Sequence, residues 1–342
     1  MTQAYQDAIR LVVAGQNLGM GAATEVMSQI MSGEVSEVQI AALLTALHVK
    51  GESADEMCGF ATAMREKAVW VKAPPDCLDT CGTGGSGLST ANTSTMSAFV
   101  LAAAGVNVAK HGNRASSGKC GSTDVLEALG VCIDPGPDEA ARLLRELNLA
   151  FLFAPRYHPA VKYVVPVRKQ IGFRTVFNFL GPLCNPAGTR RQLLGVSDPA
   201  KAPIMAEALA ELGSEKVMIV HGMDGLDEIT LTGPTRTWTV VGGTVTESLL
   251  DPEALGLATV PFASIAGGDK EENMRIFMDV LSGEELGPRR DHLLLNAAAG
   301  LYVADLVGNL KTGLGVAADM IDTGRALSVF EAYRTASQRS AP

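Results

Sequence analysis

The sequence predicts an α/β fold, in which a small all-helical domain precedes a larger domain with a mostly parallel central sheet flanked by helices. Three observations predict it. Residues 1 to about 70 show the hydrophobic spacing of helices. Pro74 and Pro75 then mark a boundary. Beyond Gly130, apolar runs typical of buried strands alternate with helical segments. We therefore expect a helical domain over residues 1–72 and an α/β domain from residue 73 onward.

Composition excludes several classes of protein. The chain has 342 residues, of which 47% are hydrophobic and 19% charged, as in ordinary globular proteins. Its formal net charge of −9 argues against nucleic acid as a partner, since phosphate binding requires a basic face. No apolar run reaches transmembrane length, and the start lacks a basic, cleavable signal pattern. We expect a cytoplasmic protein that does not bind membranes.

The six cysteines contain no C-x-x-C pair. Cys77 and Cys81 are four residues apart at a predicted junction of strand and loop, which is poor zinc geometry without nearby histidines. We interpret the cysteines as free thiols in a reducing compartment.

Two helices of the N-terminal part carry sequence signatures of their first turns. Ser36-x-x-Gln39 and Ser53-x-x-Glu56 each form a capping box before apolar residues at helical spacing, and Gly51 separates the two helices. Short amphipathic helices bury little surface alone. They are expected to pack on one another or on a partner subunit.

The next stretch combines a strand, a glycine loop and a helix start. The β-like run Cys77–Cys81 leads into Gly82–Gly87, and an apolar helix follows over Met96–Ala104. Glycines allow backbone N–H groups to approach a ligand, and the first turn of a helix offers unpaired donors and partial positive charge. Thr80 through Thr123 contains no Asp or Glu but includes Lys110, His111, Arg114 and Lys119. The stretch therefore predicts a phosphate site with a locally positive field.

Two familiar phosphate motifs do not fit this stretch. Gly82, Gly84 and Gly87 satisfy G-x-G-x-x-G, but that pattern needs an acidic residue about 20 residues later for a ribose. The corresponding region, Gly105–Val108, has no carboxylate, and the chain contains no P-loop motif. A nicotinamide enzyme is therefore disfavoured.

The remaining elements follow from hydrophobic runs. Strands are expected at Phe151–Ala154, Gln192–Val196, Val217–His221 and Thr237–Val241, and Gly242-Gly243 turns the last one into a hairpin with Thr244–Leu250. Helices are expected at Glu139–Asn148, Lys201–Leu212, Glu271–Leu281, His292–Leu306 and Val316–Arg334. A proline-rich segment, Tyr157–Gly188, interrupts the alternation.

Several separated blocks resemble the anthranilate phosphoribosyltransferase family of tryptophan biosynthesis, and the resemblance covers nearly the whole chain. The blocks are Gly82-Thr83-Gly84-Gly85, Asn92-x-Ser94-Thr95, Lys110-His111-Gly112-Asn113-Arg114 and Gly121-Ser122-x-Asp124-x-Leu126-Glu127-Ala128-Leu129-Gly130. The resemblance implies transfer of a phosphoribosyl group from 5-phosphoribosyl-1-pyrophosphate (PRPP) to the amine of anthranilate. One position departs from the family pattern: its glycine loop usually reads G-T-G-G-D-G, and here the acidic position is Ser86.

The resemblance also implies an organisation that periodicity does not give. The chain returns to the helical domain over a segment of about residues 162–187, so that the large domain comprises residues 73–161 and 188–342. The helical domain would form a homodimer contact. Mg²⁺ would be the cofactor, with two ions per subunit.

For PRPP, the resemblance implies contacts from the glycine loop, the following helix start and the Lys110 loop. The residues are Gly82, Thr83, Gly84, Gly85, Ser86, Thr90, Asn92, Ser94, Thr95, Lys110, Ser117, Lys119 and Ser122. Structural alternatives remain for each group. The glycine loop could instead be an ordinary turn after a strand. Asn92, Ser94 and Thr95 could serve only as caps of the helix, and Lys110 could be a solvated lysine at a strand end.

For anthranilate, the resemblance implies Gly82, His111, Asn113, His158, Arg168 and Pro182. The planar guanidinium of Arg168 suits a carboxylate, although an ion pair within the protein is an alternative. His111 and Asn113 could equally stabilise their loop, and His158 could be a core residue. The metal ligands implied are Ser94, Asp227 and Glu228. An acidic pair is more often a solvated surface feature, but magnesium prefers such oxygen ligands.

Two other functions stay open. A pyrimidine nucleoside phosphorylase-like enzyme would share the fold and a similar glycine loop, but Lys110–Arg114 and the Arg168–Pro186 segment argue against it. The other is a binding protein related to the same family whose active site has lost activity. Ser86, in place of the usual acidic residue, would be the first sign of that loss. Our hypothesis for an active enzyme is that Ser86 alters magnesium dependence or weakens the hold on PRPP. No residue is assigned as a general base.

Overall fold

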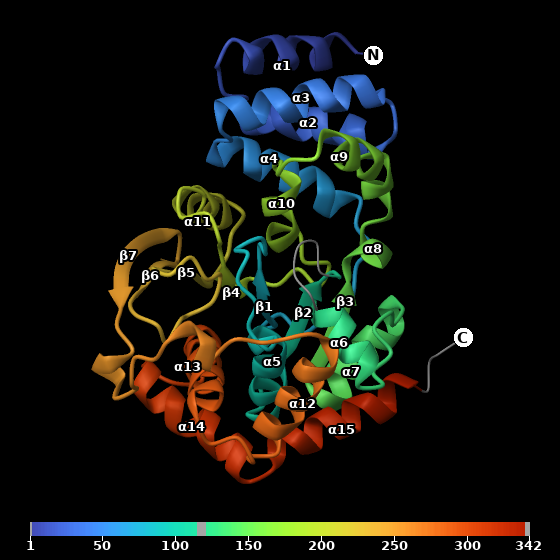
Figure 1. The fold of residues 1–342 in the computed structure, drawn as a ribbon. Coiled ribbons are helices and arrows are strands. Elements are labelled where there is room, and N and C mark those ends of the chain that lie inside the picture. Colours follow the sequence, from blue (N-terminus) through green and yellow to red (C-terminus); the bar gives the residue numbers. More distant parts are fainter. Residues whose placement is uncertain (1, 115–120, 339–342) are drawn as a thin grey trace.

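The computed structural model describes residues 2–114 and 121–338, which form a helical part and a larger part built on one sheet (Figure 1). Four helices open the chain: α1 (Gln3–Val13), α2 (Met20–Met31), α3 (Glu37–Lys50) and α4 (Ala54–Glu66). Both predicted capping boxes are confirmed. The side chains of Gln39 and Glu56 accept hydrogen bonds from the backbone N–H groups of Ser36 and Ser53, at 3.0 and 2.8 Å.

A later segment packs against these helices. It contains α8 (Ala154–Tyr157), the 3₁₀ helix η1 (Pro159–Tyr163), α9 (Val165–Ile171), α10 (Phe177–Leu180) and η2 (Gly181–Leu183). Helix α9 contacts α3, and α10 contacts α4, as Figure 1 shows in green beside blue. Val164, Val167 and Val176 are buried in the same hydrophobic cluster as the N-terminal helices. The segment therefore brings residues from the middle of the chain to the helical part.

The central sheet has seven strands in the order β3-β2-β1-β4-β5-β6-β7. The strands are β1 (Leu78–Gly82), β2 (Val108–Gly112), β3 (Leu149–Phe153), β4 (Arg191–Gly195), β5 (Lys216–Gly222), β6 (Thr235–Val241) and β7 (Thr244–Leu250). The first five are parallel, and β6 and β7 add an antiparallel edge. This confirms the mostly parallel sheet and the hairpin at Gly242-Gly243.

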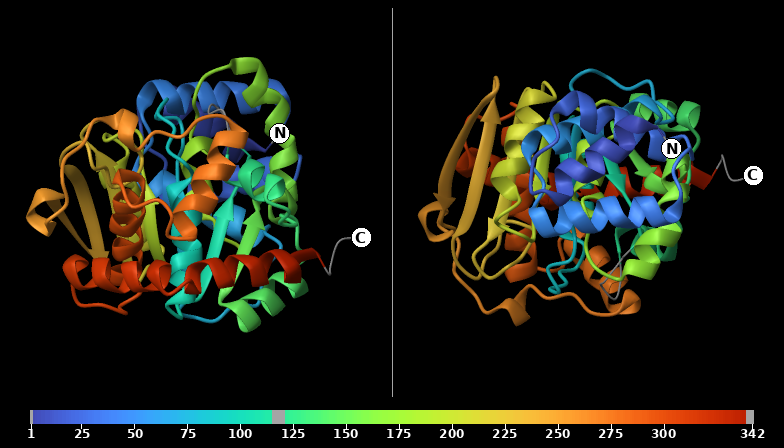
Figure 2. Two further views of the ribbon diagram at one scale, coloured as in Figure 1. Left: turned by 60° about the horizontal axis from the view of Figure 1, so that its bottom comes forward. Right: turned by 90° about the horizontal axis from the view of Figure 1, so that it is seen from above.

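Helices cover both faces of the sheet (Figure 2). They are α5 (Thr93–Ala103), α6 (Ser122–Ala128), α7 (Pro137–Leu147), α11 (Ala202–Glu211), α12 (Lys270–Leu281), α13 (Pro288–Val303), α14 (Leu310–Asp322) and α15 (Arg325–Gln338), with short 3₁₀ turns at Glu253–Leu255 and Phe262–Ser264. Helix α5 lies against α13 and α15. Its Phe99 ring packs edge-on against Phe277 and Phe330, which anchors the helix whose first turn faces the site.

Two expectations about helices are corrected. The single helix predicted over Val316–Arg334 is wrong, since α14 ends at Asp322 and α15 begins at Arg325. Gly324 has φ +73° between them, a conformation that favours glycine and ends a helix. Helix α6 was not predicted, because seven residues are too few for a periodic signal. Among the described residues, no helix has the length and apolarity needed to cross a membrane.

Candidate active site

A cleft of about 390 Å³ opens at the carboxyl ends of β1 and β2. In the sheet, β2 lies on one side of β1 and β4 lies on the other, so the order of the strands reverses at β1. Loops after β1 and β4 therefore diverge at this point, which is where open α/β sheets bind ligands. The cleft walls come from the glycine loop, the first turn of α5, the end of β2, the loop after β5 and the segment of α9 to η2.

The glycine loop is fixed from two sides. Gly84 and Gly85 have φ angles of +62° and +82°, which favour glycine. The N–H of Gly84 donates to Asp227 Oδ2 at 2.9 Å. The Gly84 carbonyl oxygen accepts from Ser197 Oγ at 2.8 Å and from Arg174 Nη2 at 3.1 Å. Within the described parts of the chain, no hydrogen bond engages the N–H groups of Gly85 or Ser86. These two donors therefore remain available to an anion.

Ser86 takes part in the shape of the loop. Its hydroxyl donates to the Leu88 carbonyl oxygen at 3.1 Å and accepts from the Leu88 N–H at 3.3 Å. Ser86 also lines the cleft. The serine thus supplies a local turn through its own side chain.

The first turn of α5 presents hydroxyl groups to the cleft. Thr95 Oγ1 is buried without a hydrogen-bond partner, and Ser94 Oγ accepts from Lys110 Nζ at 3.2 Å. Asn92 occupies the N-cap position, but the expectation that its side chain caps the helix is wrong. It lies in the left-handed region at φ 59°, and its Oδ1 accepts from Asn273 Nδ2 at 3.1 Å. Helix α12 therefore holds Asn92 at the cleft.

Lys110 is buried at the end of β2 and lines the cleft. Its ammonium donates to the Thr80 carbonyl oxygen and to Ser94 Oγ. Burial lowers the pKa of Lys110, and the nearby Asp79 carboxylate opposes that shift. The pKa of Asp79 is raised to about 6 by burial, although Lys110 and Asn185 favour its charged form. The solvated-lysine alternative is thereby excluded.

The predicted positive field has a different composition from that expected. Arg114 forms ion pairs with Glu127 at 2.6 Å and Asp124 at 3.2 Å, so its charge is compensated. Burial lowers the pKa of His111 to about 3, which leaves the imidazole neutral at pH 7. Arg168 also lines the cleft, and it forms no ion pair with any of the described acidic residues. The predicted residues Ser117 and Lys119 lie outside the described residues.

Asp227 and Glu228 lie on the loop after β5, in contact with the glycine loop. A Cβ at Gly195 would lie 1.7 Å from the Asp227 carbonyl oxygen, so glycine is required there for the carboxylates to reach the cleft. Glu228 Oε2 accepts from Thr90 Oγ1 at 2.9 Å, and the backbone N–H of Ser94 also bonds to Glu228. Burial, and then the charge of Asp227, raise the pKa of Glu228 to about 7. The surface alternative for this pair is wrong.

This donor set fits a magnesium ion. Two adjacent carboxylates, both partly buried, line the cleft together with Ser94. Among the described residues, no group of three His, Cys, Asp or Glu side chains gathers to enclose a metal. Such a partial set is typical of Mg²⁺, which takes one or two carboxylates and completes its shell with water and substrate phosphates.

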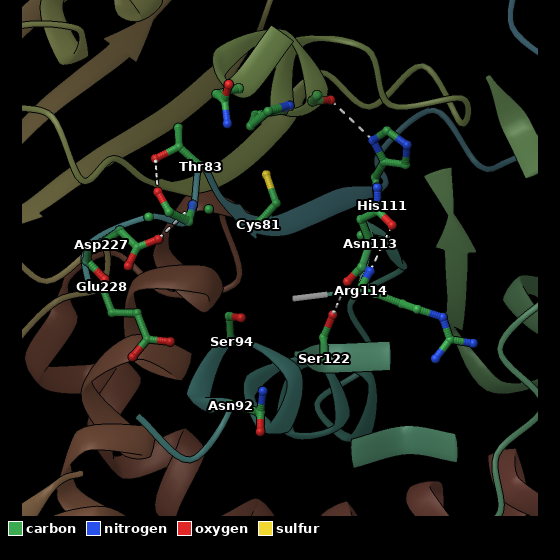
Figure 3. Close-up of a pocket in the computed structure, with 18 of the residues that line it drawn as sticks. Cys81, Thr83, Asn92, Ser94, His111, Asn113, Arg114, Ser122, Asp227 and Glu228 are labelled. Atoms are coloured by element: carbon green, nitrogen blue, oxygen red, sulfur yellow. Dashed lines mark hydrogen bonds between the residues drawn. The ribbon is translucent and has the colours of Figure 1, made fainter. Parts of the chain in front are cut away.

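The opposite wall comes from the returning segment and β2 (Figure 3). Arg168 lies half-buried with its guanidinium 5.8 Å from the centre of the Phe177 ring, and none of the described acidic side chains pairs with it. The alternative of an internal ion pair is therefore excluded. Burial lowers the pKa of Arg168. A carboxylate ligand would form an ion pair with Arg168 and accept two parallel hydrogen bonds from its guanidinium.

His111 and Pro182 line this wall, whereas His158 does not. His111 Nδ1 donates to the Gly181 carbonyl oxygen at 3.2 Å. The His158 ring is buried behind it, with centroids 5.1 Å apart, and burial lowers the pKa of His158 to about 4. His158 thus packs against His111, and its predicted contact with anthranilate stays a prediction. The exposed Asn113 lies at the rim, where Ser122 Oγ donates to its carbonyl oxygen at 3.5 Å.

Sequence reasoning missed several residues that shape the cleft. Phe177 and Asn178 line it, and Arg174, Ser197 and Asn273 form hydrogen bonds with residues that do. His292 Nε2 lies 3.7 Å from Glu228 Oε2. The cationic charge of Arg174 within an apolar segment was visible in the sequence, but nothing there indicated its partners. Ser197 and Asn273 carried no signal.

Comparison with known proteins agrees with this architecture. Residues 74–327 match the model of the α/β domain of a glycosyl transferase family, and residues 6–68 match the helical bundle domain of the same family. The chain therefore belongs to this glycosyl transferase family.

Closer relatives define the branch. The anthranilate phosphoribosyltransferase of Rubrobacter xylanophilus is 48% identical over 98% of both chains, and that of Chloroflexus aurantiacus is 50% identical over 94% of this chain and 95% of its own. The crystal structure of the Thermus thermophilus enzyme superposes with a TM-score of 0.91 at 43% identity, covering 97% of this chain and 99% of that one. The Saccharomyces cerevisiae enzyme in complex with PRPP and Mg gives 0.90 at 29% identity, with 99% of each chain covered. This chain is a member of the anthranilate phosphoribosyltransferase family.

Proposed function

We propose that the chain transfers the phosphoribosyl group of PRPP to the amine of anthranilate, releasing pyrophosphate, in tryptophan biosynthesis. The observation that carries this proposal is the pairing of two unlike walls in one cleft. We call the glycine loop, the first turn of α5, Lys110, Asp227 and Glu228 the donor half. We call Arg168, Phe177, Asn178, Pro182, His111 and Asn113 the acceptor half.

The donor half would hold PRPP. The free N–H groups of Gly85 and Ser86 suit the pyrophosphate, as does the partial positive charge at the start of α5. The unpartnered Thr95 hydroxyl and the buried Lys110 ammonium lie on the same wall. Gly82, Thr83, Thr90, Asn92 and Ser122 complete the proposed contacts, with Ser117 and Lys119 outside the described residues.

Magnesium would be held at Asp227 and Glu228 and beside the Ser94 hydroxyl, giving two ions per subunit. When bound, it neutralises the negative charge of the leaving pyrophosphate. The residues of the chain then have two tasks. The glycine loop and the first turn of α5 would fix the phosphates. Asp227 accepts a hydrogen bond from the Gly84 N–H, which holds the carboxylate pair against the glycine loop.

The acceptor half would orient anthranilate. Arg168 offers its fork to the carboxylate, while the apolar faces of Phe177 and Pro182 suit the aromatic ring. His111 and Asn113 would lie near the amine. His111 and His158 are weak proton acceptors, because burial lowers the pKa of His111 to about 3 and that of His158 to about 4. Rate enhancement then rests on positioning and charge stabilisation rather than on a histidine base.

We also propose a cytoplasmic homodimer. The apolar side chains of Leu11, Val13, Val38 and Val49 on α1 and α3 are exposed by 40 to 80%, which favours a partner over the helical part. The free thiols of Cys58, Cys77, Cys81, Cys132 and Cys184 suit a reducing compartment.

The test is a fluorescence assay. Purified protein is mixed with PRPP, MgCl₂ and anthranilate, and anthranilate fluorescence is followed. Loss that requires every component and stops with EDTA supports the proposal. No loss over a wide magnesium range, in a folded protein, would reject it, and nucleosides with phosphate would then test the phosphorylase alternative.

A further inference from the structure

Arg174 joins the returning segment to the glycine loop. It lies between α9 and α10, and its Nη1 and Nη2 donate to the Gly85 and Gly84 carbonyl oxygens at 3.4 and 3.1 Å. Nη1 also donates to Ser197 Oγ at 3.0 Å. The guanidinium lies 5.1 Å from the centre of the buried Phe179 ring, which limits where it can move.

These contacts set the direction of two peptide groups. In a trans peptide the carbonyl oxygen and the following N–H point in opposite directions. Because Arg174 holds the Gly84 and Gly85 carbonyl oxygens, the N–H groups of Gly85 and Ser86 point away from it. Glycine at positive φ has access to other conformations at little cost, so the loop itself does not fix this direction.

The Arg174 guanidinium also lies very close to the backbone of Gly85. A Cβ at Gly85 would lie 2.6 Å from Arg174 Nη1, so the guanidinium lies directly against the loop backbone. Lysine offers a compact charge without the planar fork and could not bond both carbonyl groups in this way.

We propose that Arg174 is a positioning residue that aims the Gly85 and Ser86 N–H groups at the pyrophosphate, an assignment that rests on the proposed function. Arg174 belongs to the same segment as Arg168 and Pro182, which form the acceptor half. It therefore ties the position of the donor half to the segment that carries the acceptor half. Its own guanidinium acts through the loop and not on the substrate.

The test compares Arg174→Met with Lys169→Met. Methionine keeps an unbranched side chain beside Phe179 but removes the donors. Lys169 is exposed on the same segment, and its substitution controls for the loss of one positive charge. The first readout is amide hydrogen exchange of Thr83, Gly84 and Leu88 in the free proteins, because these N–H groups of the loop are hydrogen-bonded. We expect exchange to be about tenfold faster in Arg174→Met than in the wild type or in Lys169→Met, with other segments unchanged.

The second readout is calorimetric binding of magnesium pyrophosphate, followed by steady-state kinetics. We expect Arg174→Met to weaken pyrophosphate binding and raise the KM for PRPP about tenfold, while the KM for anthranilate changes less than twofold. Arg174→Lys should recover only part of the loss. Unchanged loop exchange, or faster exchange throughout the protein with a lowered Tm, would overturn the inference. An inactive wild type that still shows the loop difference would reject the proposed function and leave the positioning of the loop intact.

Discussion

The two halves of the cleft are built in different ways. The donor half is made of backbone groups and charges that bond to one another, such as Gly84 N–H with Asp227 and Lys110 with Ser94. In the acceptor half, Arg168 forms no ion pair with any described acidic residue, and it lies near the Phe177 ring in a wall that also holds the neutral His111. The donor half is thus preorganised for phosphates and metal, whereas the acceptor half keeps a single charge for its ligand. Substitutions should therefore affect the two substrates separately.

The largest effect is expected at the carboxylate pair. Asp227→Asn and Glu228→Gln each remove a negative charge that suits Mg²⁺, with little change of shape. We expect each to lower kcat/KM for PRPP about 100-fold and to raise the magnesium concentration needed for half-maximal rate. The exposed Asp251 supplies the control Asp251→Asn, which should retain wild-type rates. Wild-type magnesium dependence in both variants would contradict the assignment of the pair.

A second prediction concerns the neutral histidines behind the acceptor half. The pKa of His158 is about 4 in the folded protein and about 6.5 when unfolded. The unfolded state therefore binds an extra proton between these values, so stability is lost as pH falls through 6.5 toward 4. His158→Gln should reduce the loss of unfolding free energy between pH 7 and pH 5 by about 2 kcal/mol.

Urea unfolding at both pH values measures this difference. The control is His48→Gln, which likewise removes one imidazole, from an exposed position on α3. Equal losses in the wild type and in His158→Gln would show that His158 does not exclude a proton in the folded state.

A third prediction separates the substrates at Arg168. Arg168→Met removes the fork for the anthranilate carboxylate, and we expect the KM for anthranilate to rise about tenfold. The KM for PRPP should change less than twofold, because no donor-half residue bonds to Arg168 in the described chain. Lys169→Met again controls for charge. If the KM for PRPP rose as much as the KM for anthranilate, Arg168 would not act on the acceptor half alone.

The smallest effect is expected at Ser86. Ser86→Asp restores the charge of the usual family pattern but cannot donate to the Leu88 carbonyl oxygen. We expect a change of about threefold in the magnesium optimum and in the KM for PRPP. Ser86→Ala breaks the turn without adding charge and serves as its control. If neither quantity changes in Ser86→Asp, the hypothesis that serine tunes the donor half fails.

The sequence predicted the elements better than the contacts between them. Hydrophobic runs and their spacing predict the strands and helices. The glycine loop and the hydroxyl-rich start of the next helix predict a phosphate site from the sequence alone. The break at Gly324 was missed because apolar residues continue on both sides of it. Arg114 was expected to add positive charge to the site, but its ion pair with Glu127 forms only in the folded chain and could not be predicted from the sequence.

The acceptor half was accessible only through the family resemblance. Arg168 and Pro182 are far from Gly82 in sequence, and hydrophobic periodicity carries no information about such long-range contacts. The same holds for Asn273, which bonds to Asn92 across 181 positions of the chain. Residues that hold others in place have ordinary amino-acid types and ordinary local patterns. Their function becomes visible only in their hydrogen bonds.

We expect the cleft to hold two different ligands at the same time. Isothermal titration calorimetry measures this, with anthranilate titrated into the wild-type protein with and without saturating magnesium pyrophosphate. Anthranilate should bind in both cases, with one molecule in each cleft, and Arg168→Met should weaken this binding. Loss of anthranilate binding when magnesium pyrophosphate is present would contradict the division of the cleft into two halves.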